Sequence, residues 1–106
     1  MTSRKAYLVA RAVVANSADR DPFDSWYEIE HLPLAKKKMR AEAAWRFWSR
    51  TDITVHYAVY QFSSMSDAVE RTSTDDFKGL LKHFDSSWPN ILRTRDLIEN
   101  VQTIKD

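Results

Sequence analysis

Two segments of the chain are apolar on both of their alternating faces, which limits the folds that the chain can adopt. The first runs from Ala6 to Ala15, interrupted only by Arg11, and the second runs from Val55 to Phe62. The first run is either a strand or a buried helix, but its valines and the polar residues 16–20 that follow it favour a strand. Strands that are apolar on both faces need cover on both sides of their sheet.

A helix is predicted between these two runs, from Pro22 to Lys38. Asp21 is the expected N-cap, because its carboxylate can accept a hydrogen bond from the first turn, and Pro22 suits the first helical position. Pro33 removes a helical hydrogen bond, so it is expected to end or kink the helix.

Helical spacing aligns three ring side chains along one line of this predicted helix: Phe23, Tyr27 and His31. The adjacent line carries Trp26 and Glu30. A line of aromatic rings that ends in a histidine beside a bend is the most site-like pattern in the sequence.

The rest of the chain supplies two more strands and a second helical region. A strand is predicted from Ala44 to Arg50, and a more polar one, near the sheet edge, from Arg95 to Ile104. A helical stripe that Pro89 ends is formed by Phe77, Leu80, Leu81 and Phe84. Ser64 with Asp67, or Ser73 with Asp76, resembles a capping arrangement at the start of this region.

The predicted order is β-α-β-β-α-β, an α+β, ferredoxin-like arrangement with a four-stranded antiparallel sheet. We expect one domain over residues 1–106. Both helices of this fold lie on one face of the sheet, and no segment remains to cover the other face. We therefore expect a homodimer in which the two sheets pack face to face.

Composition excludes several classes of function. Sixteen basic and fifteen acidic residues leave a net charge of +1, so nucleic acid and membrane surfaces are not expected partners. The absence of cysteine excludes disulfides and thiolate metal sites, and three separated histidines make no metal-binding motif. No segment resembles a membrane span or a signal peptide, so a soluble, cytoplasmic protein is expected.

The helix sequence Trp26-Tyr27-x-x-Glu30-His31-Leu32-Pro33 resembles the dimeric α+β barrel superfamily and, within it, the EthD-like proteins. Trp88, shortly before the last strand, is similar too. One departure is that such proteins usually carry glycine in the turn after the first helix, whereas residues 39–44 contain none. A left-handed residue there without glycine costs roughly 1–2 kcal/mol.

The resemblance implies a ligand cavity, either between the sheet and the helices or within the barrel, and chemistry on small, often aromatic or polyketide-like molecules. His31 is the candidate acid or base, because only imidazole titrates near neutral pH, and Tyr27 is its candidate partner one turn away. The candidate substrate-binding residues are Trp26, Glu30, Arg46 and Trp88. An arginine such as Arg46 can bind a carboxylate or an enolate.

Three hypotheses for function follow. The first is a lyase, isomerase or cyclase that needs no cofactor and acts on a small aromatic or carbonyl compound. The second is a dimeric binding or stress-associated protein without catalysis, in which His31 only satisfies packing. The third is a haem enzyme, which needs an axial histidine facing a large cavity. We expect no cofactor and no metal.

Overall fold

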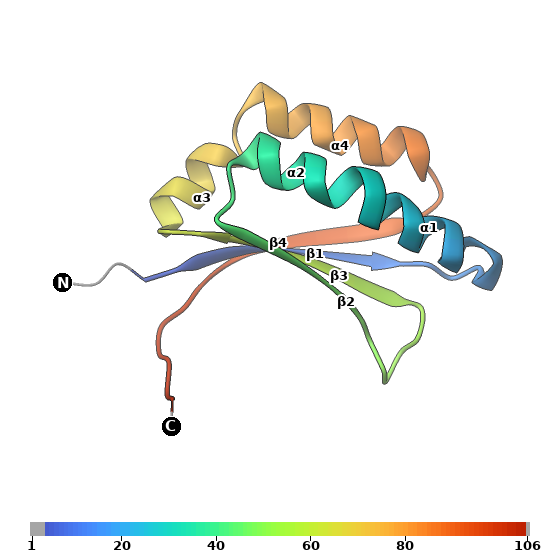
Figure 1. The fold of residues 1–106 in the computed structure, drawn as a ribbon, viewed down its shortest axis with the longest axis horizontal. Helices are drawn as coiled ribbons and strands as arrows, with labels where there is room; N and C mark the ends of the chain where they lie inside the picture. The colour runs from blue at the N-terminus through green and yellow to red at the C-terminus, as the bar shows by residue number, and fades with distance from the viewer. Residues whose placement is uncertain (1–3, 106) are drawn as a thin grey trace.

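The structure, a computed structural model, describes residues 4–105 as one four-stranded sheet covered by helices on one face (Figure 1). The strands are β1 (Ala6–Val13), β2 (Ala43–Trp48), β3 (Val55–Phe62) and β4 (Leu92–Glu99). They are ordered β2-β3-β1-β4, and every neighbouring pair is antiparallel. The predicted ferredoxin-like α+β fold is confirmed.

The helices follow the predicted order, with more breaks than expected. They are α1 (Arg20–Trp26), a π-helical turn (Tyr27–His31), α2 (Leu32–Met39), α3 (Met65–Arg71) and α4 (Asp75–Ser87). A single 3₁₀ turn (Ser17–Asp19) precedes α1. All of the labelled helices lie on the same side of the sheet (Figure 1).

The predicted N-cap at Asp21 is wrong, because the helical segment begins earlier. Asn16 accepts a hydrogen bond from the Ala18 N–H and starts the 3₁₀ turn, from which α1 continues at Arg20. The residue before α1, Asp19, makes no side-chain capping hydrogen bond.

Pro33 does not end the helix, because the turn before it is widened. The Leu32 N–H bonds to the carbonyl of Tyr27, five residues back, and α2 then continues to Met39. A proline ring clashes with the carbonyl four residues earlier, here that of Ile29, and an extra residue in the turn relieves such a clash. Widened turns of this kind are frequent at functional sites.

The turn after α2 has a left-handed residue although it lacks glycine. Arg40 has φ 51° and ψ 43°, and its N–H caps the helix on the carbonyls of Lys36 and Lys37. The chain therefore keeps the left-handed cap and accepts its conformational cost.

The second helical region consists of two helices, each with its own cap. Ser64 accepts from the Asp67 N–H at the start of α3, as predicted. The start of α4 is capped by Thr74, which accepts from the Phe77 N–H, rather than by Ser73. α4 ends at Ser87, two residues before Pro89.

The last strand lies at the sheet edge as predicted, but its bounds differ from 95–104. β4 pairs with β1 along its whole length, from Val13 opposite Leu92 to Ala6 opposite Glu99. This register turns the side chains of Arg93, Arg95 and Leu97 toward the helices. The shift brings two arginines over the helix-covered face.

The other face of the sheet is apolar and has no helix over it (Figure 1). Trp45 and Phe47 of β2 are exposed there, at 40% and 51%, and the ring of Tyr7 lies 6.5 Å from that of Trp45. No helix in the described residues is long and apolar enough to span a membrane.

Candidate functional site

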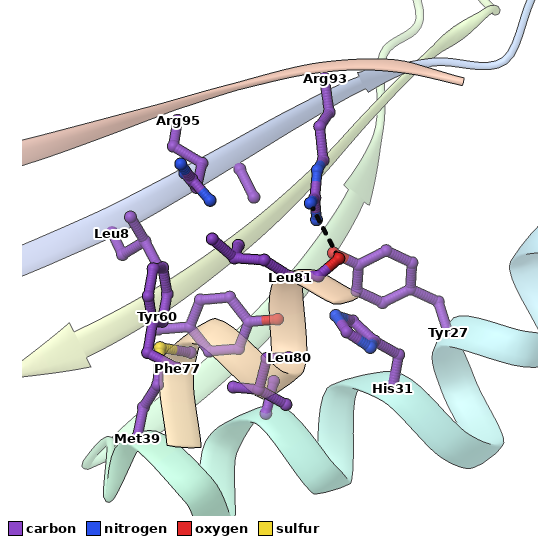
Figure 2. Close-up of a pocket in the computed structure, with 12 residues that line it drawn as sticks. Leu8, Tyr27, His31, Met39, Tyr60, Phe77, Leu80, Leu81, Arg93 and Arg95 are labelled. Carbon is purple, nitrogen blue, oxygen red and sulfur yellow. Dashed lines mark hydrogen bonds between the residues drawn. The ribbon is translucent and has the colours of Figure 1, made fainter. Parts of the chain in front are cut away.

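A small cavity of about 30 Å³ lies between the sheet and the helices (Figure 2). Its wall is mostly apolar, with polar groups from two strands, β3 and β4, and from the π-helical turn. The lining residues are Leu8, Ala10, Tyr27, His31, Ala35, Met39, Tyr60, Phe77, Leu80, Leu81, Arg93 and Arg95. A cavity of this size has room for water but not for an aromatic ring, since an engineered cavity of about 150 Å³ is needed to hold benzene.

Two tyrosine hydroxyls belong to this wall. Tyr27 comes from the π-helical turn and Tyr60 from β3, and both side chains are buried. Burial raises the pKa of Tyr27 to about 12, and it raises the pKa of Tyr60 well above its ordinary value. Both hydroxyls therefore keep their protons at neutral pH. The opposite effects of their mutual hydrogen bond on the two pKa values identify Tyr60 as the donor to Tyr27, so the proton of Tyr27 is the one available to a ligand.

His31 is held between two other rings. The widened turn brings Trp26 onto the same side of the helix, where its ring stacks on His31 with centroids 4.5 Å apart. On the other helix, His83 of α4 places its Nδ1 3.0 Å from Nδ1 of His31. Tyr27 meets His31 edge-on, with centroids 5.0 Å apart. In Figure 2 the His31 ring points into the cavity beside Tyr27.

The surroundings of His31 keep its imidazole neutral. Only 5% of the residue is exposed, and burial lowers its pKa to about 3, with further lowering from His83 and Arg93. The neutral ring has one donor and one acceptor nitrogen. His31 is therefore a neutral hydrogen-bonding group in the ligand-free protein rather than a group that titrates near pH 7.

Arg93 supplies a half-buried positive charge to the cavity wall. It donates to the carbonyl of Leu81 at 3.2 Å and to Asp85 at 3.0 Å, and 17% of its side chain is exposed. Burial lowers its pKa, yet a guanidinium stays protonated in proteins. Figure 2 shows Arg93 and Arg95 reaching from β4 toward the cavity from one side, across from Tyr27 and His31.

The cavity adjoins an open groove between α4 and β4. Leu81, Arg93 and Arg95 line both the cavity and the groove. Leu81 of α4 and the two arginines of β4 therefore stand where the two spaces meet. A ligand larger than water needs space from the groove as well as from the cavity.

Comparisons with known proteins identify the fold. No family model and no curated protein matches the sequence. An ethyl tert-butyl ether D (EthD) family protein from Bacillus halodurans matches with a TM-score of 0.73 and 18% identity, over 92% of this chain and 99% of that one. SnoaB, a cofactor-independent oxygenase from Streptomyces nogalater, matches with a TM-score of 0.66 and 13% identity, over 98% of this chain and 100% of SnoaB.

A dimeric ferredoxin-like protein from an uncultured marine organism also matches, with a TM-score of 0.58 and 12% identity, over 96% of this chain and 100% of that one. The chain has the fold of the dimeric α+β barrel superfamily. The resemblance predicted from the helix motif is thus confirmed for the fold, and identities this low carry no statement about activity.

Of the predicted site residues, the structure brings only Tyr27 and His31 into the cavity wall. Glu30 is exposed on the far side of the helical segment. Trp26 and Trp88 are half-buried; Trp26 packs against His31, and Trp88 packs against Phe23 with centroids 5.4 Å apart. These two rings support the site from behind rather than line it.

Arg46 lies outside the cavity wall, because a carboxylate on α1 holds it. Its guanidinium donates to Asp24 at 2.8 Å, and the Trp48 Nε1–H donates to the same oxygen at 2.8 Å. These two hydrogen bonds hold the pKa of Asp24 below its usual value, with that of Trp48 contributing most. Arg46 therefore fixes the start of α1 on β2.

The residues that sequence reasoning missed are Tyr60, Arg93, Arg95 and His83. The two arginines were hidden by the predicted strand bounds, which left Arg93 outside the last strand. No sequence pattern marks these arginines, because residues 92–98 show no clear apolar alternation.

The cavity does not fit haem. The space beside His31 is of water size, far below that of a porphyrin. The described residues also contain no group of three or more His, Asp or Glu side chains placed to hold a metal ion.

Proposed function

We propose that the protein binds a small aromatic compound with a carbonyl or carboxylate group between its helices and its sheet, where the cavity meets the open groove along β4 and the groove supplies the room for the ring. The observation that carries this proposal is the guanidinium of Arg93 in a mostly apolar wall, facing two protonated tyrosine hydroxyls. Apolar walls with a few convergent polar groups are typical of ligand sites. The apolar wall suits a ring, and the polar groups suit an oxygen anion.

The chemistry that we propose is proton transfer beside a carbonyl, as in a lyase, isomerase or cyclase without a cofactor. Arg93 and Tyr27 would stabilise the oxygen anion of an enolate, which needs preorganised donors. His31 would accept or return the proton. Its low pKa in the ligand-free protein makes it a weak base, and an anion bound next to it would raise that pKa.

Substitution of Arg93 tests this proposal. We expect Arg93→Met to weaken binding of benzoylformate, an aromatic keto acid, by at least about tenfold, because a hydrogen bond to a charged group contributes about 1.5–3 kcal/mol. Arg46→Met is the matched control, since this arginine also projects from a strand toward the helices and pairs with an aspartate but lies outside the cavity wall. Isothermal titration calorimetry of the two variants measures the difference.

Binding of acetophenone shows how much of the effect of Arg93 depends on the carboxylate of the ligand and how much on its aromatic ketone. Acetophenone offers the same aromatic ketone without the carboxylate, so Arg93→Met should change its binding less than that of benzoylformate. Equal benzoylformate affinity in the wild type and both variants would contradict the assignment of Arg93.

A second candidate function is a binding or stress-associated protein without catalysis. The small size of the cavity favours it, because a nearly filled helix–sheet interface is what a packing role for His31 requires. Binding of acetophenone without any exchange of its methyl protons for deuterium would support this candidate over the enzyme.

We further propose that the protein acts as a homodimer through the open face of its sheet. The exposed aromatic residues of β2 support this, since a second copy can cover them. A neighbour in fold is described as a dimeric ferredoxin-like protein.

The charge variant Phe47→Glu is expected to abolish this dimer, because it buries an unpaired carboxylate at the face. Light scattering should give twice the 12.4 kDa chain mass for the wild type and the single-chain mass for the variant. Ile29→Glu, at a 72% exposed position in the helical layer, should leave the mass unchanged. A monomeric wild type would contradict the proposal.

A further inference from the structure

His31 and His83, which are 52 residues apart in sequence, form a hydrogen-bonded pair between the π-helical turn and α4. Their rings are nearly parallel, with an interplanar angle of 13° and centroids 5.2 Å apart. Both rings also stack on the indole of Trp26, at 4.5 Å for His31 and 5.2 Å for His83. Three flat rings packed in this way fix the direction in which each Nδ1 points.

The pair connects the cavity with the outside of the molecule. His31 is buried and belongs to the cavity wall, whereas His83 is half-buried on α4 and does not line the cavity. Each imidazole has two nitrogens, and in each ring Nδ1 is used in the contact. The Nε2 atoms are therefore the two free ends of the pair.

We propose that His83 and His31 form a proton relay that joins the solvent to the cavity. The relay rests on the proposed function for its use, because a reaction that removes and returns a proton in a closed cavity needs a route for that proton. The imidazole ring suits this role, since it can bind a proton at one nitrogen and release one from the other.

The proton count of one inward transfer is balanced. Nε2 of His83 takes a proton from water, and the proton on its Nδ1 moves across the hydrogen bond to Nδ1 of His31. His31 then releases its Nε2 proton to an acceptor in the cavity. The hydrogen bond has now reversed its direction, so the pair is set for one outward transfer, which restores the first state.

The distance between the two Nδ1 atoms and the positive charge of Arg93 both favour transfer of a proton through the pair over its retention on His31. At 3.0 Å only one of the two Nδ1 atoms can carry a proton, because two N–H groups would collide. Arg93 adds a positive charge beside His31 and disfavours a resting imidazolium there. A proton that reaches His31 is therefore passed on.

The test measures how fast the ring N–H protons of His31 exchange with water, by NMR in the ligand-free protein. His83→Asn keeps a polar atom near the position of Nδ1 but has no second nitrogen that can take up a proton. We expect exchange in this variant to slow by roughly 10²-fold, the lower range for a positioned proton-transfer group. Lys82→Ala, the neighbouring change on α4, should leave the rate unchanged.

Chemical rescue separates a relay from a packing role. In His83→Ala, added imidazole should restore exchange, whereas 1-methylimidazole should not, because it has only one nitrogen that can bind a proton. Wild-type exchange in His83→Asn, or equal rescue by both compounds, would overturn the relay. No ligand is present, so this result does not depend on whether benzoylformate binds.

Discussion

Replacing Phe23 with alanine is expected to lower the free energy of unfolding by about 3–5 kcal/mol, the usual cost of removing a buried phenylalanine. Phe23 is fully buried and lies at the centre of the aromatic cluster. Six rings stand within 6.3 Å of its own: Trp26, Tyr27, Trp48, His56, Phe84 and Trp88. They come from the helical layer, two strands and the segment after α4, so no single neighbour can move in to fill the space.

Urea denaturation measures this loss. Ile29→Ala is the matched control, because it removes an apolar side chain from the same helical segment at a 72% exposed position and should cost less than about 0.5 kcal/mol. A loss in Phe23→Ala no larger than that of the control would show that the cluster does not hold the helices on the sheet.

Acid is expected to destabilise the fold by about 2–4 kcal/mol between pH 7.5 and pH 5, through two buried histidines. Burial lowers the pKa of His31 to about 3 and that of His56 to about 4, whereas each has a pKa of about 6.5 in the unfolded chain. Below pH 6.5 the unfolded chain therefore binds more protons than the folded one. Stability is complete above this pH and falls as the pH drops.

The slope of stability against pH tests this account better than stability itself. Each histidine contributes up to about 1.4 kcal/mol per pH unit. We expect His31→Gln and His56→Gln each to reduce the slope by about half of the combined contribution of the two groups. Urea denaturation at several pH values between 7.5 and 5 gives this slope, and an unfolding free energy that is flat over this range would contradict the burial of both rings.

Hydrophobic patterning predicted much of the fold because the strands carry their own signal. The alternation in Val55–Phe62 matches β3, and the first apolar run contains β1. β4 was misplaced because its arginines and Asp96 look like solvent-exposed positions. Only its pairing with β1 shows that Arg93 and Arg95 face the helices.

Sequence reasoning placed together those candidate-site residues that are close in sequence. It could not find the contacts that depend on how distant segments pack. Tyr27 and His31 stand one turn apart, so helical spacing alone placed them together. The contact of His31 with His83 depends on how two helices pack, and the stacking of Trp26 on His31 depends on the π-helical turn. Arg46 lies outside the cavity wall because it pairs with Asp24, and no sequence pattern shows that pairing.

The most direct test of the cavity as a ligand site is an NMR titration of His31 with and without benzoylformate, 4-hydroxybenzoate and acetophenone. The account predicts no titration of His31 between pH 5 and 8 in the free protein, because burial lowers its pKa to about 3. A bound acid should shift the signals of His31 and Tyr27 and raise the pKa of His31. Signals that none of the three compounds moves would contradict the central claim that this cavity binds an aromatic carbonyl compound.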